Sequence, residues 1–272
     1  MRRPKPRGSA INMRRVRTWV EDFYGYRTAV TEARIDRWIK QFQSVDRDLA
    51  ARVLDCVEFI SHEKMTAALR QGLRSVPGWT DDDATRQGKW RFVAYSESAG
   101  ESGDMMLSRL RLANALTQRR YNPLFIHRSE LLREGLGPDD SVVFVDDFSG
   151  TGDQVCGNWP IFQELLPGDP KVYLILVGAT VSARDRIARE TEMSLVTDVL
   201  LNEQDNVFAS RFFTPDEKAN LLRYCELGDR KKPRGWGDCG LLVVFAHRCP
   251  NDSVPVLHAD NRKWEGLFRR HG

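Results

Sequence analysis

Short apolar runs alternate with amphipathic stretches along most of this chain. Six runs, each bounded by turn residues, predict strands: 91–95, 124–126, 142–145, 172–177, 195–201 and 241–246. Helix-like segments separate several of them: 104–115, 155–166 and the stretch that ends near 191. Short runs rich in β-branched residues are typical of strands covered on both faces, and their alternation with helices is typical of a parallel sheet. The pattern predicts an α/β fold with a doubly wound, mostly parallel sheet.

The residues before the first of these strands have a different pattern. Apolar positions recur at helical spacing from Thr31 to about Val76, with Asp46 and Ser61 as candidate caps, and Pro77-Gly78 ends the pattern. We therefore predict three parts: a basic N-terminal arm over 1–30, a helical module over 31–80 and an α/β domain over 90–272.

The charge of the chain is unevenly distributed. Net charge is +3, but the first 17 residues carry seven basic side chains and no acidic one, which leaves −4 on the remainder. Such an arm can bind nucleic acid or an acidic protein, and aromatic residues that follow it can stack on bases. A solvated end, with its aromatic residues docked on the chain's own domain, is the alternative.

Composition excludes several classes of protein. No run reaches the roughly 18 apolar residues of a membrane helix, and the basic N-terminus lacks the apolar segment of a secretory signal. The five cysteines are scattered without a Cys-x-x-Cys pair, which favours a reducing compartment over a zinc site. We expect a cytoplasmic protein that does not contact the membrane.

The stretch from Ser141 to Gln154 carries the most specific signal. An apolar strand ends in Asp146 and Asp147, and a glycine-containing loop then opens a helix. Glycines and a helix N-terminus present backbone N–H groups to an anion. The candidate phosphate cradle consists of Ser149, Gly150, Thr151, Gly152, Asp153 and Gln154. The two carboxylates can accept hydrogen bonds from sugar hydroxyls or help to position Mg²⁺.

This stretch has two other interpretations. No Lys-Ser/Thr follows the glycines, so a Walker phosphate loop is disfavoured. A plain parallel strand with an Asp/Gly turn and a helix cap remains open.

A second strand–loop–helix unit precedes the acidic pair. The strand at 91–95 is followed by small residues, among them Ser98, Gly100, Ser102 and Gly103, and then by a helix. Their N–H groups can bind an anion, although Glu97 and Glu101 would repel pyrophosphate unless Mg²⁺ bridges them. Further along, His127 is either a base or a turn residue. The basic segment 229–240 is either a mobile loop over a site or a surface loop anchored by Trp236.

The acidic pair and the Thr-Gly loop resemble the signature of type I phosphoribosyltransferases. The whole of residues 31–270 resembles one branch, the PRTase-CE proteins of bacterial conflict systems, which include retron-associated antiphage cassettes. The matching pieces are 38–42, 103–111, 146–154 and 242–255. The resemblance implies that Asp146 and Asp147 bind the ribose hydroxyls of 5-phosphoribosyl-1-pyrophosphate (PRPP), the cradle its 5′-phosphate, and the loop before the helix its pyrophosphate.

Three departures from the family pattern shape the functional expectation. Gly150 stands where purine enzymes often place an acidic residue, Gln154 replaces a hydroxyl side chain, and 119–140 is short for a flexible catalytic loop. They favour binding of a phosphoribosyl group over nucleobase salvage. The resemblance then implies an antiphage effector that acts on nucleotide metabolism, with a partner from the same operon. A non-catalytic sensor of PRPP or a nucleotide is the alternative.

Overall fold

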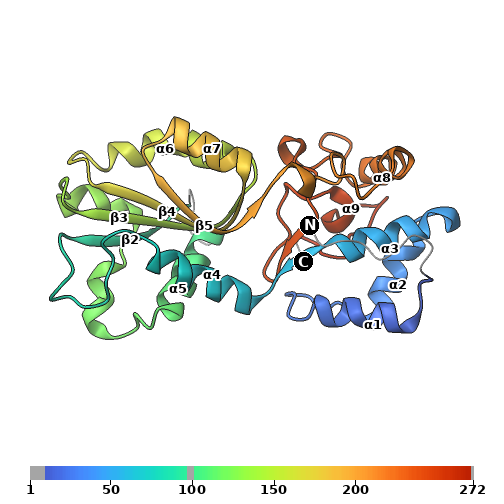
Figure 1. Cartoon of the computed structure of the whole chain (residues 1–272), viewed down its shortest axis with the longest axis horizontal. Coiled ribbons are helices and arrows are strands. Elements are labelled where there is room, and N and C mark those ends of the chain that lie inside the picture. The colour runs from blue at the N-terminus through green and yellow to red at the C-terminus, as the bar shows by residue number, and fades with distance from the viewer. Residues whose placement is uncertain (1–9, 97–100, 271–272) are drawn as a thin grey trace. The chain divides into compact units, whose positions relative to one another are not determined.

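The computed structural model describes residues 10–96 and 101–270, and its internal contacts divide the chain into two compact units. Unit 1 combines the residues up to His62 with those from Leu201 onward, and unit 2 spans Glu63–Leu200 (Figure 1). Among the described residues, no helix is both long and apolar enough to span a membrane.

Unit 2 contains the parallel sheet that the sequence predicts. Its strands, in spatial order, are β2 (Trp90–Ala94), β3 (Ser141–Ser149), β4 (Lys171–Thr180) and β5 (Ser194–Leu201). β3 is parallel to both of its neighbours, with Val93 opposite Phe144 on one side and Leu174 opposite Phe144 on the other. The seven residues of β3 that precede Phe148 are all buried, as expected for a central strand covered on both faces.

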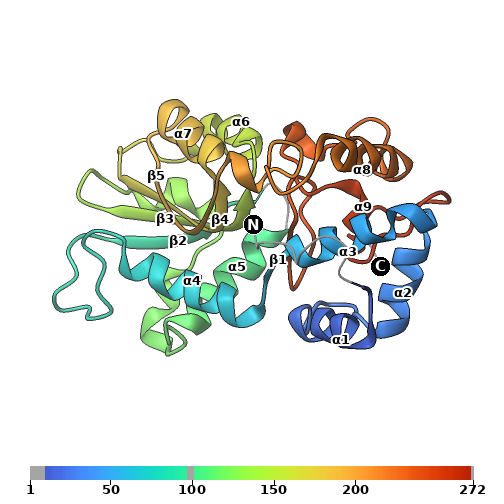
Figure 2. The ribbon, with the colours of Figure 1, turned by 45° about the vertical axis from the view of Figure 1, so that its right-hand side comes forward.

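Helices cover both faces of this sheet. Figures 1 and 2 show α4 (His62–Arg74) and α5 (Ser102–Ala113) on one face, and α6 (Asp153–Glu164) and α7 (Val181–Glu190) on the other. Under α6, the rings of Tyr95, Phe144 and Phe162 pack against one another with centroids 4.5–5.4 Å apart. The predicted doubly wound α/β class is therefore confirmed.

The segment between α5 and β3 differs from the prediction. It forms two 3₁₀ helices, η2 (Arg119–Leu124) and η3 (Arg128–Glu134), and the strand predicted over 124–126 is wrong. Among the described residues, the strand-type pairing of this segment with the sheet is one isolated bridge, between Phe92 and Phe125. Leu124 is buried and Phe125 and Ile126 are half-buried, but Pro123 lacks the N–H that a continuing ladder would need.

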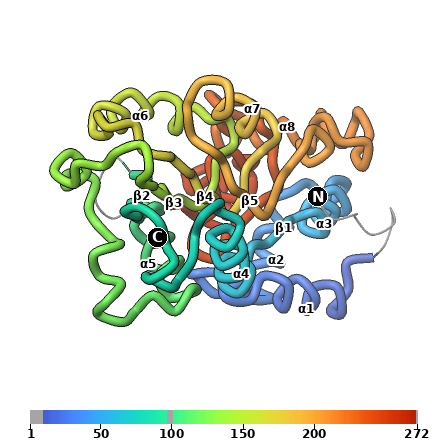
Figure 3. The backbone as a smooth tube through the Cα atoms, turned by 60° about the vertical axis from the view of Figure 1, so that its left-hand side comes forward, coloured from blue at the N-terminus to red at the C-terminus, as the bar shows by residue number. Residues whose placement is uncertain are grey.

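Unit 1 is built from the two ends of the chain (Figures 1 and 3). Its elements are α1 (Met13–Asp22), α2 (Glu32–Lys40), η1 (Ser44–Asp46), α3 (Arg47–Cys56), β1 (Glu58–Ile60), η4 (Glu203–Asp205), α8 (Pro215–Gly228), η5 (Trp236–Asp238), β6 (Val243–Phe245) and α9 (Pro255–His258). β1 pairs in parallel with β6. The indole N–H groups of Trp38 and Trp264 both donate to the Val256 carbonyl, at 2.8 and 2.9 Å.

The contacts thus group the chain differently from the predicted boundaries near residues 30 and 80–90. Of the helices in the predicted 31–80 module, α2 and α3 belong to unit 1, whereas α4 packs on the sheet of unit 2. The C-terminal residues join the N-terminal helices through β6 and Trp264. The sequence of a short strand shows that it is buried but does not identify the strand with which it pairs. The pairing of segments about 200 residues apart therefore could not be predicted from the local pattern.

Candidate functional site

β3 holds the acidic pair at its carboxyl end. Asp146 and Asp147 are each 5% exposed, and Asp146 lies opposite Leu176 of β4. Oδ1 of Asp146 accepts the N–H of Asp147, and Oδ1 of Asp147 accepts the N–H of Phe148, both at 2.8 Å. The strand continues to Ser149, so the pair lies within β3 rather than after it, as the predicted run of 142–145 implied. These bonds orient both carboxylates.

The predicted phosphate cradle is a tight turn that leads into α6. Gly152 has φ +78° and occupies the N-cap position of the helix, which is a conformation that favours glycine. The Thr151 hydroxyl accepts the N–H of Asp153 at 3.1 Å, and the Gly150 carbonyl accepts the Thr180 hydroxyl at 2.5 Å. The backbone N–H groups of the first turn of α6 therefore begin directly behind the turn.

An arginine from α7 compensates the carboxylate at the start of α6. The Arg186 guanidinium forms an ion pair with Asp153, a second with Glu190, and reaches the Thr151 carbonyl at 3.4 Å. Hydrogen bonds to both carboxylates raise the pKa of Arg186 above its ordinary value. Asp153 alone would repel a phosphate at this helix end, so the ion pair keeps the local charge compatible with an anion.

The second predicted loop reaches the same edge of the sheet. Ser102 Oγ donates to Asp146 Oδ1 at 2.8 Å. Ser102 and Gly103, predicted as loop residues, instead form the first turn of α5. A Cβ on Gly103 would lie 3.0 Å from the Tyr95 carbonyl oxygen, so glycine allows the helix to start against the end of β2. Ser98 and Gly100 lie outside the described residues.

Three helix N-termini meet at this edge. α5 follows β2, α6 follows β3 and α7 follows β4. The Ser102–Asp146 bond joins the first turn of α5 to β3, and the Thr180–Gly150 bond joins the N-cap of α7 to the turn before α6. Each helix N-terminus carries partial positive charge and unpaired N–H groups. Their convergence at the carboxyl ends of parallel strands is the geometry of anion-binding sites in open α/β sheets.

Other candidate residues have structural roles. His127 is exposed, and its side chain caps η3 together with Glu130, which supports the turn-residue interpretation. In unit 1, Lys232 Nζ lies 3.0 Å from the centroid of the Trp236 ring, and the backbone N–H of Trp236 donates to the Asn251 carbonyl. The segment 229–240 is thus fastened to its own unit, as the surface-loop interpretation expects.

The acidic pair offers a limited donor set for a metal. Within residues 10–96 and 101–270, no group of three or more His, Cys, Asp or Glu side chains could hold an ion. Mg²⁺ is commonly bound by one or two carboxylates with the remaining ligands from substrate phosphate and water. Asp146 and Asp147 fit a magnesium ion shared with a bound phosphorylated ligand.

Comparison with protein-family models gives a match over residues 35–270, to PRTase-CE. The chain belongs to the PRTase-CE family. The match includes residues of both units and the whole candidate site. A search of the curated proteins found no match. Family membership establishes a phosphoribosyltransferase-like protein, in agreement with the resemblance seen in the sequence.

Two site residues of this PRTase-CE chain were not predicted from sequence. Thr180 closes the turn at Gly150 and also caps α7 through the N–H of Ala183. Arg186 balances Asp153 from 33 residues away. Thr180 had a local signal, because a Thr at the end of an apolar strand and before a helix is a candidate N-cap. Arg186 had no such signal in the sequence, because arginines are common on the polar faces of amphipathic helices.

Proposed function

We propose that this PRTase-CE protein binds the ribose 5-phosphate part of PRPP or of a nucleotide at the carboxyl ends of β2 and β3. The observation that carries the proposal is the 2.8 Å hydrogen bond from Ser102 to Asp146, which joins the two candidate anion loops around the acidic pair. Asp146 and Asp147 would accept the ribose hydroxyls. The turn Ser149–Gln154 and the N-terminus of α6 would hold the 5′-phosphate, and the N-terminus of α5 the pyrophosphate.

The arrangement supports phosphoribosyl transfer. In that reaction the bond from ribose C1 to pyrophosphate breaks, a nucleophile bonds to C1, and positive charge develops on the sugar ring. The carboxylates would fix the ring, and the helix N-termini would stabilise the phosphate charge. A magnesium ion shared by the acidic pair and the substrate would neutralise charge on the departing pyrophosphate. The nucleophile is either a nucleobase, which gives a nucleotide, or water, which gives ribose 5-phosphate; PRPP is consumed and pyrophosphate released in both cases.

Binding without turnover is the second candidate function. Gly150 has no side chain to act as a base, and residues 119–134 are held as η2 and η3 beside β2. In this case the site senses PRPP or a nucleotide. Either activity suits an effector of bacterial antiphage defence that works with a protein encoded in the same operon.

Calorimetric titration with PRPP, with and without Mg²⁺, tests the proposal while pyrophosphate release is assayed. The variant Asp146→Asn/Asp147→Asn should lose binding, whereas Asp139→Asn/Glu164→Gln, which removes two exposed carboxylates of the same unit, should retain it. With nucleobases supplied as acceptors, binding with pyrophosphate release identifies an enzyme, and binding without it identifies a sensor. If the wild-type protein binds neither PRPP nor a nucleotide, the proposal is wrong.

The role in defence needs a separate test in cells. Bacteria that carry the complete operon would be challenged with phage, and plaque counts compared between the wild-type gene and Asp146→Asn/Asp147→Asn. We expect protection to be lost in the variant. Equal protection by both would show that the acidic pair does not serve defence.

A further inference from the structure

A cavity of about 620 Å³ lies in unit 2 at the far end of α5 from the acidic pair. Its walls are the last turns of α4, the residues after α5, and the loop that precedes β2. The lining residues are Arg70, Arg74, Trp79, Thr80, Asp81 and residues 113–116. α5 runs from Ser102 to Ala113, about 16 Å at 1.5 Å per residue, so the cavity is separate from the candidate ribose-phosphate site.

The cavity gathers positive charge on an acidic unit. Residues 63–200 contain 16 Lys and Arg against 20 Asp and Glu, a net charge of −4. Arg70 and Arg74 are one helical turn apart on α4 and both line the cavity. Arg70 donates through Nε to the Ala113 carbonyl at 2.8 Å, which leaves its two terminal nitrogens for a ligand. Within the described parts of the chain, Arg74 makes no hydrogen bond or ion pair.

Two further arginines lie within four residues of the lining segment 113–116 and make no ion pair with a carboxylate among the described residues. Arg111 donates to the Leu116 carbonyl at 3.0 Å and lies over the Phe125 ring. Arg120 donates to the Tyr121 hydroxyl at 2.7 Å. Most other buried or half-buried arginines of the unit, such as Arg86 and Arg91, pair with an acidic side chain. Among the residues that line the cavity, two arginines accompany a single carboxylate, that of Asp81, so positive charge is in excess.

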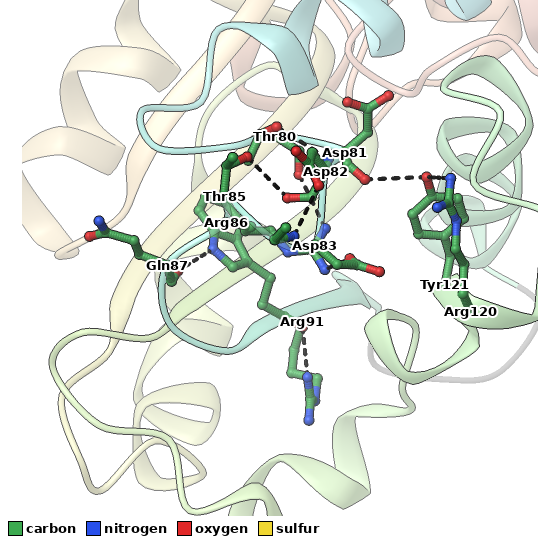
Figure 4. A network of polar contacts seen from close by, with 12 residues as sticks. Thr80, Asp81, Asp82, Asp83, Thr85, Arg86, Gln87, Arg91, Arg120 and Tyr121 are labelled. Carbon is green, nitrogen blue, oxygen red and sulfur yellow. Dashed lines mark hydrogen bonds and ion pairs between the residues drawn. The ribbon is translucent and has the colours of Figure 1, made fainter.

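The wall formed by the loop is held in place before any ligand arrives (Figure 4). The Arg86 guanidinium lies over the Trp79 ring at 5.2 Å and donates to the Thr80 carbonyl at 3.1 Å. The Tyr121 hydroxyl donates to the Asp81 carbonyl at 3.2 Å. The Trp79 ring also packs edge-on against Phe92, with centroids 4.9 Å apart. A cavity with one wall so fastened is preorganised, which lowers the entropic cost of binding.

The three adjacent aspartates of this loop serve the turn itself. Asp82 Oδ1 accepts the N–H of Ala84 at 3.0 Å, and Asp83 forms an ion pair with Arg86 (Figure 4). These bonds argue against a cation site made by the three carboxylates together. Asp81 alone lines the cavity, as an acceptor beside the arginines.

We propose that this cavity binds an organic phosphate of the size of a nucleoside monophosphate. The Arg70 and Arg74 guanidinium groups would hold the phosphate, as arginine does in charge-assisted pairs. The Trp79 ring, Ala115 and Leu116 supply an apolar surface for a planar ring, and Asp81 accepts a hydroxyl group. The volume lies within the range of small-molecule pockets and exceeds what inorganic phosphate would fill.

Calorimetric titration with AMP tests the proposal on Asp146→Asn/Asp147→Asn, and in parallel on the wild-type protein saturated with PRPP. The double variant disables the candidate ribose-phosphate site, and PRPP occupies it in the wild-type protein. The variant therefore reports on the second site even if PRPP does not bind. We expect one AMP per chain. Arg74→Gln should weaken the affinity for AMP at least about tenfold, because a hydrogen bond to a charged group contributes that much or more. The control is Arg133→Gln, which removes an exposed arginine of the same unit that makes no bond among the described residues. It should change the affinity for AMP by less than about twofold, as surface substitutions usually do.

Two further measurements separate the parts of the proposal. Because Arg70 also caps α5, Arg70→Lys is the gentler change there, and it should weaken AMP binding while the thermal unfolding midpoint stays close to that of the parent. Adenosine and inorganic phosphate should each bind more weakly than AMP. No AMP binding in either arrangement, binding that Arg74→Gln leaves unchanged, or adenosine binding as tight as AMP binding would each overturn the proposal.

Discussion

Ser102 Oγ donates to Asp146 Oδ1 across 2.8 Å, and this bond connects the first turn of α5 to the carboxyl end of β3. Asp146 Oδ1 also accepts the N–H of Asp147 at the same distance. One carboxylate oxygen thus connects the first turn of α5 to the backbone of the acidic pair. The orientation of Asp146 is therefore tied to the position of α5.

Ser102→Ala tests this connection. Loss of one hydrogen bond to a carboxylate should cost about 1–2 kcal/mol of stability and weaken PRPP binding several-fold. Chemical denaturation and calorimetry measure the two effects. Ser108→Ala, at an exposed position of the same helix, should change neither. If Ser102→Ala binds PRPP as the parent does, the bond does not orient the site.

Gly103 and Gly157 form a matched pair of helical glycines. A Cβ at Gly103 would lie 3.0–3.1 Å from three backbone atoms of Tyr95, whereas one at Gly157 meets nothing within 4 Å. Gly103→Ala should destabilise the protein by about 1–3 kcal/mol and weaken ligand binding, because α5 must shift. Gly157→Ala should stabilise it by up to about 1 kcal/mol through helix propensity. Thermal unfolding distinguishes them, and equal shifts of the two midpoints would contradict the close approach.

The basic N-terminal arm includes a buried ion pair. Arg15 Nη2 lies 2.6 Å from Asp55 Oδ2, and the two side chains are 3% and 4% exposed. Asp55 also accepts the indole N–H of Trp19. Asp55→Asn removes the negative charge from this buried ion pair and should cost about 3–5 kcal/mol. Asp36→Asn breaks the exposed pair with Lys40 and should cost less than about 0.5 kcal/mol. Denaturant unfolding gives both values, and a similar cost for the two would refute the buried role.

This packing bears on nucleic-acid binding by the arm. Trp19, Phe23 and Tyr26 are buried, so their rings are not available to stack on bases, and only Tyr24 of these four described aromatic residues is exposed. We expect deletion of residues 1–9, which removes four of the seven basic side chains but leaves the Asn12 cap of α1, to change any affinity for DNA or RNA by less than about twofold at physiological salt. Titration at several salt concentrations measures this. A large loss of affinity and of salt dependence would support an arm that binds nucleic acid.

His258 makes unit 1 sensitive to acid. Burial lowers the pKa of His258 from 6.5 to about 4, and its ring Nε2 lies 3.0 Å from the Ser253 carbonyl. The unfolded chain takes up a proton below pH 6.5 and the folded chain only near pH 4, so stability falls as pH drops through this interval. The loss should approach about 3 kcal/mol, since the shift is about 2.5 pKa units at 1.4 kcal/mol per unit. His258→Gln should flatten the unfolding free energy between pH 6.5 and 4; an unchanged slope would show that other groups cause it.

The sequence by itself determined the local elements and the place of the candidate site. The apolar runs before Asp146 and at 172–177 predicted β3 and β4, because a strand buried on both faces needs a continuous apolar segment. Ser61, a candidate cap, predicted the start of α4, because a cap acts within a few residues. The glycine turn predicted an anion site for the same reason: its conformation depends on residues adjacent in the chain.

Tertiary structure alone decided which segments share a unit and which side chains complete the sites. Asp46 was predicted as a cap of α3, yet its carboxylate instead accepts the Tyr224 hydroxyl of α8 at 2.7 Å. Arg186 balances Asp153, and the cavity beside Arg74 draws its walls from three separate segments. These contacts join residues tens to hundreds of positions apart. Their geometry follows from how the helices pack on the sheet, and hydrophobic periodicity records only which face of an element is buried, not what covers it.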